Sequence, residues 1–158
     1  GSSEAAAEGG GWTGSGAGVD AATMGSAGGG GGCSRLSSTE AALAMRDKVW
    51  DWLMDKGSEV NGLVAEDADG KLIGLAHFRP FARPLAASVG GFLDDLFVDP
   101  DARGSGAADA LMEALKAEGV KRGWSVIRWI TAEDNYRARK LYDRMAEKTR
   151  WVTYDIKL

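Results

Sequence analysis

The stretch "FLDDLFVDPDARGSGAADALMEAL", residues 92–115, decides the fold of this chain. Its apolar start, "FLDDLFV", has the composition of a strand, and Pro100 ends strand pairing because proline has no N–H to donate. A loop of small residues, 103–108, then leads into an amphipathic run whose apolar positions recur at helical spacing. The stretch therefore predicts a strand, a glycine-containing loop and a helix over residues 105–116.

The loop at 103–108 has the chemistry of an anion site. Small residues let a ligand approach the backbone, and the first N–H groups of a helix are unpaired and carry the positive end of its dipole. Such a site suits a pyrophosphate. The loop is not a P-loop, since no GxxxxGK[ST] occurs, and it is not GxGxxG, since position 109 is Asp109. From spacing alone, a plain strand–turn–helix connection is the stronger alternative.

The composition excludes several classes of protein. Of the 158 residues, 44% are apolar and 27% charged, which predicts one domain with a proper core. The net charge of -4 provides no basic face for nucleic acid. A single cysteine, Cys33, and a single histidine, His77, exclude an internal disulfide and a cysteine-rich or multi-histidine metal site, so we expect no metal. With no membrane-length apolar run and no visible secretory signal, we expect no membrane contact and a cytoplasmic protein.

Glycines divide the chain into two parts. Residues 1–37 contain 13 of the 23 glycines and little that is large and apolar, so we expect a flexible tail or leader there. Residues 38–158 are expected to form the folded domain, a mixed α/β structure. Its first predicted elements are a helix from the capping box "SSTE" at 37–40 to a stop at Gly57, and then a hairpin of strands 61–67 and 71–81 joined by an Asp-Gly turn. A loop over 82–91 leads to a strand over 92–98 and to the helix over 105–116, which Gly119 ends. The last predicted elements are a strand over 125–132, a helix over 135–148 and a final strand over 150–158.

Two segments resemble the acetyl-CoA motifs of the GNAT superfamily of N-acetyltransferases. The run "LFVDPDARGSGAADAL" is similar to its pattern Arg/Gln-x-x-Gly-x-Gly/Ala after a strand, which Arg103, Gly106 and Ala108 meet. The run "AEDNYRARKLYDRMAEK" is similar to its second motif, with an Asn, a small residue and "LY". The resemblance covers about residues 38–158, closely in the second half and loosely in the first. The polyamine (spermidine/spermine) acetyltransferases of this superfamily resemble the chain most, through an acidic pair before an aromatic-Val strand end.

The resemblance implies a GNAT-like fold whose mixed sheet opens between its fourth and fifth strands and admits acetyl-CoA as a co-substrate. GNAT domains usually begin with a strand and a helix that have no counterpart before residue 37, so the fold is expected to be shortened at its N-terminus. The residues that the resemblance places against the cofactor are Leu96, Phe97, Val98, Arg103, Gly104, Ser105, Gly106, Ala107, Ala108, Asn135, Ala138 and Tyr142.

Acetyl transfer from a thioester to an amine requires a neutral amine, a stabilised oxyanion and a proton for the departing thiolate. By similarity, Asp94 takes the position of the acid that relays the amine proton, and Tyr142 that of the general acid. A tyrosine on an apolar helix face can equally be a core residue. Asp94 and Asp95 are neighbours on a strand and are therefore expected to point to opposite faces. A backbone N–H at Phe97 or Val98 is the expected oxyanion donor.

Four residues complete the expected acceptor side of the cleft: Asp95, His77, Phe78 and Trp50. His77 could be a base or a wall residue of this site. Three of the four have a structural alternative, since a lone histidine on a strand, a hairpin phenylalanine and a helical tryptophan often belong to the core. The expected function is N-acetylation of a small primary amine, such as a polyamine or amino acid, by direct attack in a ternary complex. The alternatives are an acyl-CoA-binding module with little catalysis and a protein or peptide N-acetyltransferase. The resemblance also makes a homodimer an expectation.

Overall fold

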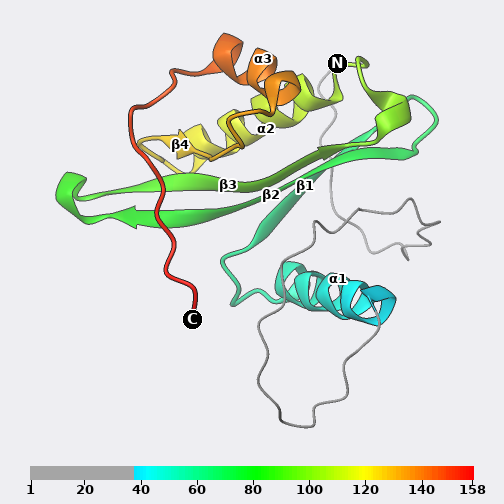
Figure 1. Ribbon diagram of the computed structural model, residues 1–158, viewed down its shortest axis with the longest axis horizontal. Coiled ribbons are helices and arrows are strands. Elements are labelled where there is room, and N and C mark those ends of the chain that lie inside the picture. The colour runs from blue at the N-terminus through cyan, green and yellow to red at the C-terminus, as the bar shows by residue number, and fades with distance from the viewer. Residues whose placement is uncertain (1–37) are drawn as a thin grey trace, which may run out of the picture. The chain divides into compact units, whose positions relative to one another are not determined.

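A computed structural model describes residues 38–158 and divides the chain into two compact units, which meet between Met54 and Asp55 (Figure 1). The described part of the first unit is the helix α1, Ser38–Met54, which begins within the predicted capping box. The second unit is residues 55–158 and contains the sheet. The tail predicted over residues 1–37 lies outside the described residues. Among those described, no helix is long and apolar enough to cross a membrane.

The second unit is a mixed α/β fold, as predicted, and its sheet has four strands where five were expected. The strands β1 (Asn61–Glu66), β2 (Leu72–Arg83), β3 (Ser88–Val98) and β4 (Ile127–Arg128) lie side by side in this order. The first two pairings are antiparallel, and β3 pairs with β4 in parallel through the crossover helix α2 (Ala107–Lys121). Figure 1 shows α2 and the last helix, α3 (Tyr136–Met145), on the same side of the sheet.

The core lies between α2 and one face of the sheet. The apolar positions that predicted the helix include Leu111, Met112 and Leu115, which are all buried. They pack against Ala76, Phe78 and Leu93 from β2 and β3. The apolar residues that recur at helical spacing in α2 and those that face one side of the sheet therefore form a single apolar layer.

A β-bulge interrupts β3 at Asp94. His77 pairs with Asp95 and the next residue, Phe78, pairs with Leu93, which leaves Asp94 without a partner on β2. A bulge adds one residue to one strand and breaks the alternation of side chains. Asp94 and Asp95 are therefore both exposed on the face opposite Phe78, and the expectation that they point to opposite faces is wrong.

The β2–β3 hairpin is longer than predicted. Residues 82–91 were expected to form a loop, but β2 continues to Arg83 and β3 begins at Ser88, with only the short 3₁₀ helix Pro84–Ala86 and Ala87 between them. Gly90 and Gly91 suggested a loop, yet they lie in β3 because aromatic rings occupy the space where their side chains would be. Packing, which local sequence does not display, decides the strand here.

Three further elements differ from the prediction. Gly119 does not end α2 but is buried inside it, where a Cβ would lie 3.0 Å from Ile127 Cδ1. The strand expected over 125–132 is reduced to Ile127–Arg128. The final strand expected over 150–158 is absent, and that segment has no regular secondary structure. A β-branched and aromatic run becomes a strand only when another strand pairs with it.

Arg122, one residue beyond α2, joins the helix to the sheet. Its Nε donates to Glu118 Oε1 at 2.6 Å and its Nη2 donates to Asn61 Oδ1 of β1 at 2.9 Å. The guanidinium also lies over the rings of Phe78 and Trp124, at 5.6 and 5.3 Å from their centroids. The hydrogen bond from Arg122 lowers the pKa of the Glu118 carboxyl, and desolvation, which alone would raise this pKa, offsets only part of the effect.

We expect Arg122→Ala to lower the free energy of unfolding by about 1–2 kcal/mol, because it removes two hydrogen bonds and two cation–π contacts. Urea denaturation measures this change, with Lys116→Ala as the exposed control, because Lys116 pairs with Glu113 and not with Glu118. Since the pKa of Glu118 is lowered on folding, its contribution is present at neutral pH and is lost as the pH falls below the unfolded value near 4.5. A difference between wild type and variant that does not shrink in acid would contradict this account.

Candidate functional site

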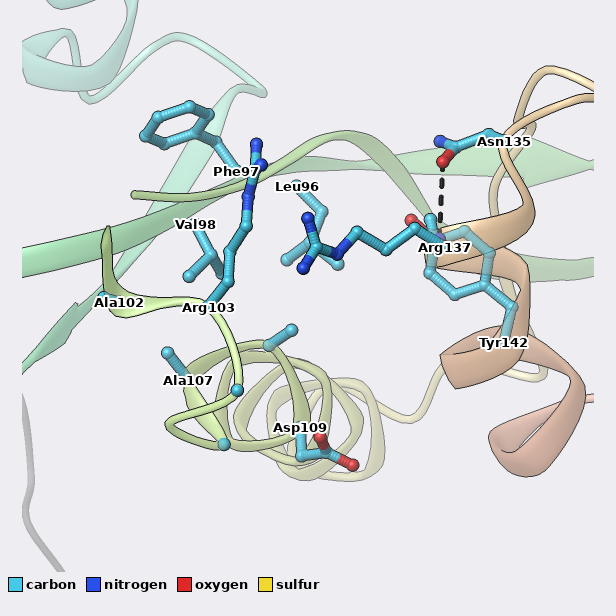
Figure 2. A pocket seen from close by; sticks show the side chains of 14 residues that line it. Leu96, Phe97, Val98, Ala102, Arg103, Ala107, Asp109, Asn135, Arg137 and Tyr142 are labelled. Atoms are coloured by element: carbon cyan, nitrogen blue, oxygen red, sulfur yellow. Dashed lines mark hydrogen bonds between the residues drawn. The ribbon is translucent and has the colours of Figure 1, made fainter. Parts of the chain in front are cut away.

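A pocket of about 400 Å³ lies where β3 ends and α2 begins (Figure 2). Its walls come from three segments that the sequence separates, namely the end of β3, the loop into α2 and the first two turns of α3. The lining residues are Leu96, Phe97, Val98, Ala102, Arg103, Gly104, Gly106, Ala107, Ala108, Asp109, Asn135, Arg137, Ala138 and Tyr142. Of the residues predicted to contact a cofactor, only Ser105 is missing from this set.

The strand edge in the pocket is open because the sheet splays there. β4 pairs with β3 only at Gly91 and Phe92. Beyond Phe92, no strand among residues 38–158 pairs with that side of β3 as far as Val98. The backbone of residues 96–98 can therefore pair with an extended ligand as another strand would. The sheet was expected to open between its fourth and fifth strands; among the described residues it has four strands and opens between the third and the fourth.

The loop into α2 presents its backbone to the pocket. The 3₁₀ helix Pro100–Ala102 begins the turn, and the Asp99 carboxylate fixes it by accepting from Asp101 N at 2.9 Å. Gly104 and Gly106 then have φ values of 88° and 89°, a conformation that side chains disfavour. A Cβ at either position would meet nothing within 4 Å. The glycines are thus required by the backbone conformation, and they leave open space beside it.

The amides of Ala108 and Asp109, in the first turn of α2, are available to an anion. The first hydrogen bond of the helix joins Ala110 N to Gly106 O at 2.9 Å. The amides that precede Ala110 lie in the first turn, where a helix offers them no carbonyl partner. Ser105 Oγ accepts a long bond of 3.4 Å from Ala107 N, so this side chain serves the turn. Partial positive charge therefore gathers at the pocket, as predicted.

Two arginines bring full positive charge to the pocket from two of its sides. Figure 2 shows Arg103 from the loop and Arg137 from α3 extending into the space beside β3. Planar guanidinium groups are well suited to phosphate oxygens. Arg103 was predicted from the sequence, whereas Arg137 was not. Its only signal was its place two residues after Asn135 in the second motif.

Asn135 begins α3 and holds the helix in place. Its Oδ1 accepts from Ala138 N at 3.3 Å, and its Nδ2 donates to Thr131 Oγ1 at 3.2 Å. It is therefore an N-cap residue in addition to lining the pocket. An ion pair between Arg144 of α3 and Asp109 of α2 ties the two helices together across the pocket.

Tyr142 lies on α3 at the side of the pocket opposite the loop (Figure 2). Its ring is half-buried and packs edge-on against Trp129, with centroids 5.3 Å apart. Burial raises the pKa of the phenol above its ordinary value. The hydroxyl is therefore protonated throughout the neutral range and can act as a proton donor. Tyr142 is therefore compatible with both alternatives, a packed core residue and a general acid, since its ring is packed while the residue lines the pocket.

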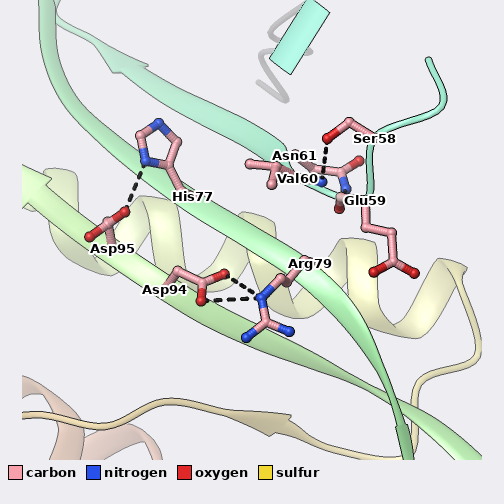
Figure 3. Close-up of polar contacts among 8 residues, drawn as sticks. All are labelled: Ser58, Glu59, Val60, Asn61, His77, Arg79, Asp94 and Asp95. Carbon is pink, nitrogen blue, oxygen red and sulfur yellow. Dashed lines mark hydrogen bonds and ion pairs between the residues drawn. The ribbon is translucent and has the colours of Figure 1, made fainter. Parts of the chain in front are cut away.

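The remaining residues predicted for the acceptor side are not among those that line this pocket. Phe78 is 2% exposed and belongs to the core, so the structural alternative holds for it. Trp50 lies on α1 in the first unit, and its role at the cleft stays a prediction. His77 and Asp95 face each other on the open face of the sheet, with Nδ1 to Oδ2 at 3.1 Å (Figure 3). Asp94 is held by Arg79 on the same face.

Comparisons with known proteins point to one family. The sequence model of the family described as "Acetyltransferase (GNAT) family" matches residues 34–146. A yeast protein, the D-amino-acid N-acetyltransferase HPA3 of Saccharomyces cerevisiae, is 31% identical over 94 residues, which are 59% of this chain and 58% of that protein. The uncharacterized N-acetyltransferase YhfO of Bacillus subtilis is 33% identical over 94 residues, 58% of this chain and 62% of that protein. The chain thus spans about 60% of the length of these curated relatives.

Solved structures share the fold. The ribosomal-protein-alanine N-acetyltransferase of Brucella melitensis superposes with a TM-score of 0.61 at 28% identity, over 71% of this chain and 76% of that one. An acetyltransferase of Trypanosoma brucei superposes with a TM-score of 0.54 at 18% identity, over 78% and 82% of the two chains. The second likeness is one of fold alone.

Proposed function

Because this chain belongs to the GNAT family of acetyltransferases, we propose that it transfers an acetyl group from acetyl-CoA to a primary amine of a small molecule. The observation that carries the proposal is the pocket beside β3. It joins an unpaired strand edge, a glycine loop at a helix N-terminus and a protonated phenol. These three features correspond to the extended arm, the pyrophosphate and the sulfur of acetyl-CoA.

The fit of acetyl-CoA rests on the chemistry of the donors in each part of the pocket. Open space beside Gly104 and Gly106 allows phosphate oxygens to approach the backbone amides. Arg103 and Arg137 bring two cations to the same place, where they offset the charge of the phosphates. The backbone of residues 96–98 is left to pair with the amides of the pantetheine arm. When bound, acetyl-CoA supplies the activated acetyl group.

The residues of the chain then have distinct tasks. The strand edge orients the thioester, and a backbone N–H at Phe97 or Val98 stabilises the oxyanion that forms when the amine attacks. Tyr142 donates its proton to the departing sulfur, which completes the release of free CoA. The half-buried position of this phenol keeps it neutral until that step.

We infer that the acceptor is a small amine, with amino acids as the leading class. The yeast relative is named a D-amino-acid N-acetyltransferase, which supports this class. A polyamine is supported by the acidic pair Asp94 and Asp95. However, the Arg79 guanidinium offsets the charge of Asp94, so only Asp95 of the pair is left without a permanent cation beside it to attract a polycation. The name of the Brucella structure supports a peptide N-terminus as a further candidate.

The test is release of free CoA thiol from acetyl-CoA, measured with a thiol reagent and a panel of amines. The panel contains D-alanine, L-alanine, spermidine and an alanine-starting peptide. We expect release above background with at least one amine, and the preferred amine identifies the acceptor class. If calorimetry detects acetyl-CoA binding while no amine causes release, the chain is a binding module. If neither binding nor release occurs, the proposed function is wrong.

A further inference from the structure

Two acid–base pairs lie next to each other on the open face of the sheet, beside the bulge in β3 (Figure 3). His77 and Arg79 are successive outward residues of β2. The side chain of His77 contacts that of Asp95 on β3, and the side chain of Arg79 contacts that of Asp94. The bulge is what brings both carboxylates to this face. The residue after Asp95 is Leu96, where the wall of the pocket begins. The two pairs are thus next in the chain to the part of β3 that lines the pocket.

The two pairs differ in whether they leave a group available to accept a proton. The Arg79 Nε lies 3.3 Å from Asp94 Oδ1 and 3.2 Å from Oδ2, so the guanidinium engages both oxygens of this carboxylate. Arg79 is also fixed from behind, because its guanidinium lies 5.1 Å from the centroid of the Phe92 ring. An amine that approached this carboxylate would have to compete with Arg79 for both of its oxygens. Asp94 therefore does not suit the proton relay that the sequence predicted for it.

The His77–Asp95 pair leaves a base available. His77 Nδ1 lies 3.1 Å from Asp95 Oδ2, and a carboxylate in this position fixes a neutral imidazole with its proton on Nδ1. The lone pair is then on Nε2, for which no hydrogen bond is found within residues 38–158. Figure 3 shows that ring nitrogen pointing away from Asp95. The imidazole is 20% exposed, so it is held in place but can be reached.

We propose that the His77–Asp95 pair is the proton acceptor of the acetyl transfer, and that Arg79 holds Asp94 out of that role. The inference rests on the proposed function and names the residue that makes the amine reactive. His77 is the base that touches the amine, and Asp95 is a positioning residue that fixes the ring. The arrangement repeats the logic of a histidine oriented by a carboxylate in other acyl-transfer enzymes.

The protons balance in this scheme. The ammonium gives one proton to His77 Nε2, and Asp95 stabilises the resulting imidazolium. The neutral amine attacks the thioester carbon, so a C–N bond forms and the C–S bond breaks. Tyr142 gives its proton to sulfur, and the second proton of the amine nitrogen restores the phenol. His77 returns its proton to solvent, so the net products are the amide, free CoA and one proton.

The other charged groups near His77 are few and can be controlled for. On β3 they are Asp95 and Asp94, and on β2 the next outward residue is Arg79. On β1 the residue opposite His77 is Gly62, which has no titratable side chain. Figure 3 places one further carboxylate, Glu59, in the segment that leads into β1. A pH effect assigned to His77 must therefore survive the replacement of Asp94 and of Glu59.

The experiment compares the pH dependence of kcat for wild type, His77→Gln, Asp95→Asn and Asp94→Asn at saturating amine, using the panel amine that wild type acetylates fastest. A base that must be unprotonated to accept the proton of the amine gives kcat an acidic limb. We expect His77→Gln to lower kcat about 10²-fold and to abolish this limb. We expect Asp95→Asn to lower kcat about tenfold and to move the limb, whereas Asp94→Asn and Glu59→Gln retain it. Calorimetric acetyl-CoA affinity, equal in all variants, shows that each has folded.

The outcomes are distinguishable. If wild type acetylates no amine, the proposed function fails and the assignment of His77 fails with it. If wild type is active and His77→Gln keeps both its kcat and its acidic limb, only the assignment of the pair is wrong. Loss of the limb in Asp94→Asn and not in His77→Gln would make Asp94 the proton acceptor. A pair that merely stabilises the sheet would change unfolding and leave the limb in place.

Discussion

Tyr142→Phe is expected to lower kcat by about 10²-fold while the affinity for acetyl-CoA stays nearly intact. The substitution removes only the hydroxyl, so the ring still packs against Trp129 and the pocket keeps its wall. General acid catalysis contributes about 10²- to 10⁴-fold to a rate. Without the phenol, the thiolate must leave unprotonated or take a proton from water. Steady-state kinetics and calorimetry with acetyl-CoA measure the two quantities separately.

Tyr136→Phe provides the matched control, because Tyr136 is an exposed tyrosine at the start of the same helix and does not line the pocket. It is expected to retain wild-type kcat. The raised pKa of Tyr142 adds a second readout, since the phenol loses its proton only above about pH 10. Activity should therefore show no basic limb from this residue below that pH. Equal turnover in Tyr142→Phe and wild type would remove the phenol from the mechanism.

Gly91→Ala is expected to lower the free energy of unfolding by about 3 kcal/mol, the upper end of the usual cost of overpacking. A Cβ at this position would lie 2.2 Å from Cζ3 of the Trp124 ring. That ring cannot easily retreat, because it packs edge-on against Phe78 and lies under the Arg122 guanidinium. Gly91 is also where β4 pairs with β3. The methyl group must therefore either move the ring or separate the strands.

A double-mutant cycle identifies the cause of this loss. In the background of Trp124→Leu, which removes the ring, Gly91→Ala should cost less than about 1 kcal/mol, so the two changes are strongly non-additive. Urea denaturation of the four proteins gives the coupling energy. Because the splay of the sheet begins just beyond Gly91, the single variant should also bind acetyl-CoA more weakly. A cost that is the same in both backgrounds would show that backbone conformation, and not the ring, requires glycine.

Much of the pocket could be predicted from local sequence. Arg103, Gly104 and Gly106 are neighbours in the chain, and their properties follow from a turn that needs positive φ and a helix that begins directly afterwards. The strand edge at residues 96–98 and Tyr142 on α3 were predicted through motifs of the same local kind. All of them line one pocket. Features that a few consecutive residues create are visible in one sequence.

Contacts between distant segments could not be predicted in this way. Arg137 is an ordinary polar residue of an exposed helix until α3 is placed over the end of β3. The helix continues through Gly119, and β3 through Gly90 and Gly91, because neighbouring side chains fill the space beside these glycines. The run over 150–158 has strand composition but no strand to pair with it. Each case depends on a neighbour that is far away in the sequence.

The sequence by itself determined the family, the order of the elements around the loop and the anion-binding character of residues 103–108, since these depend on residue types at short spacing. Only the tertiary structure decided which base the open face offers. The bulge at Asp94 places both carboxylates on one face, where Arg79 takes one and His77 the other. The physical reason is that the pairing of β3 with β2 leaves Asp94 as one additional residue in β3. Such a residue reverses the face to which every later side chain of the strand points.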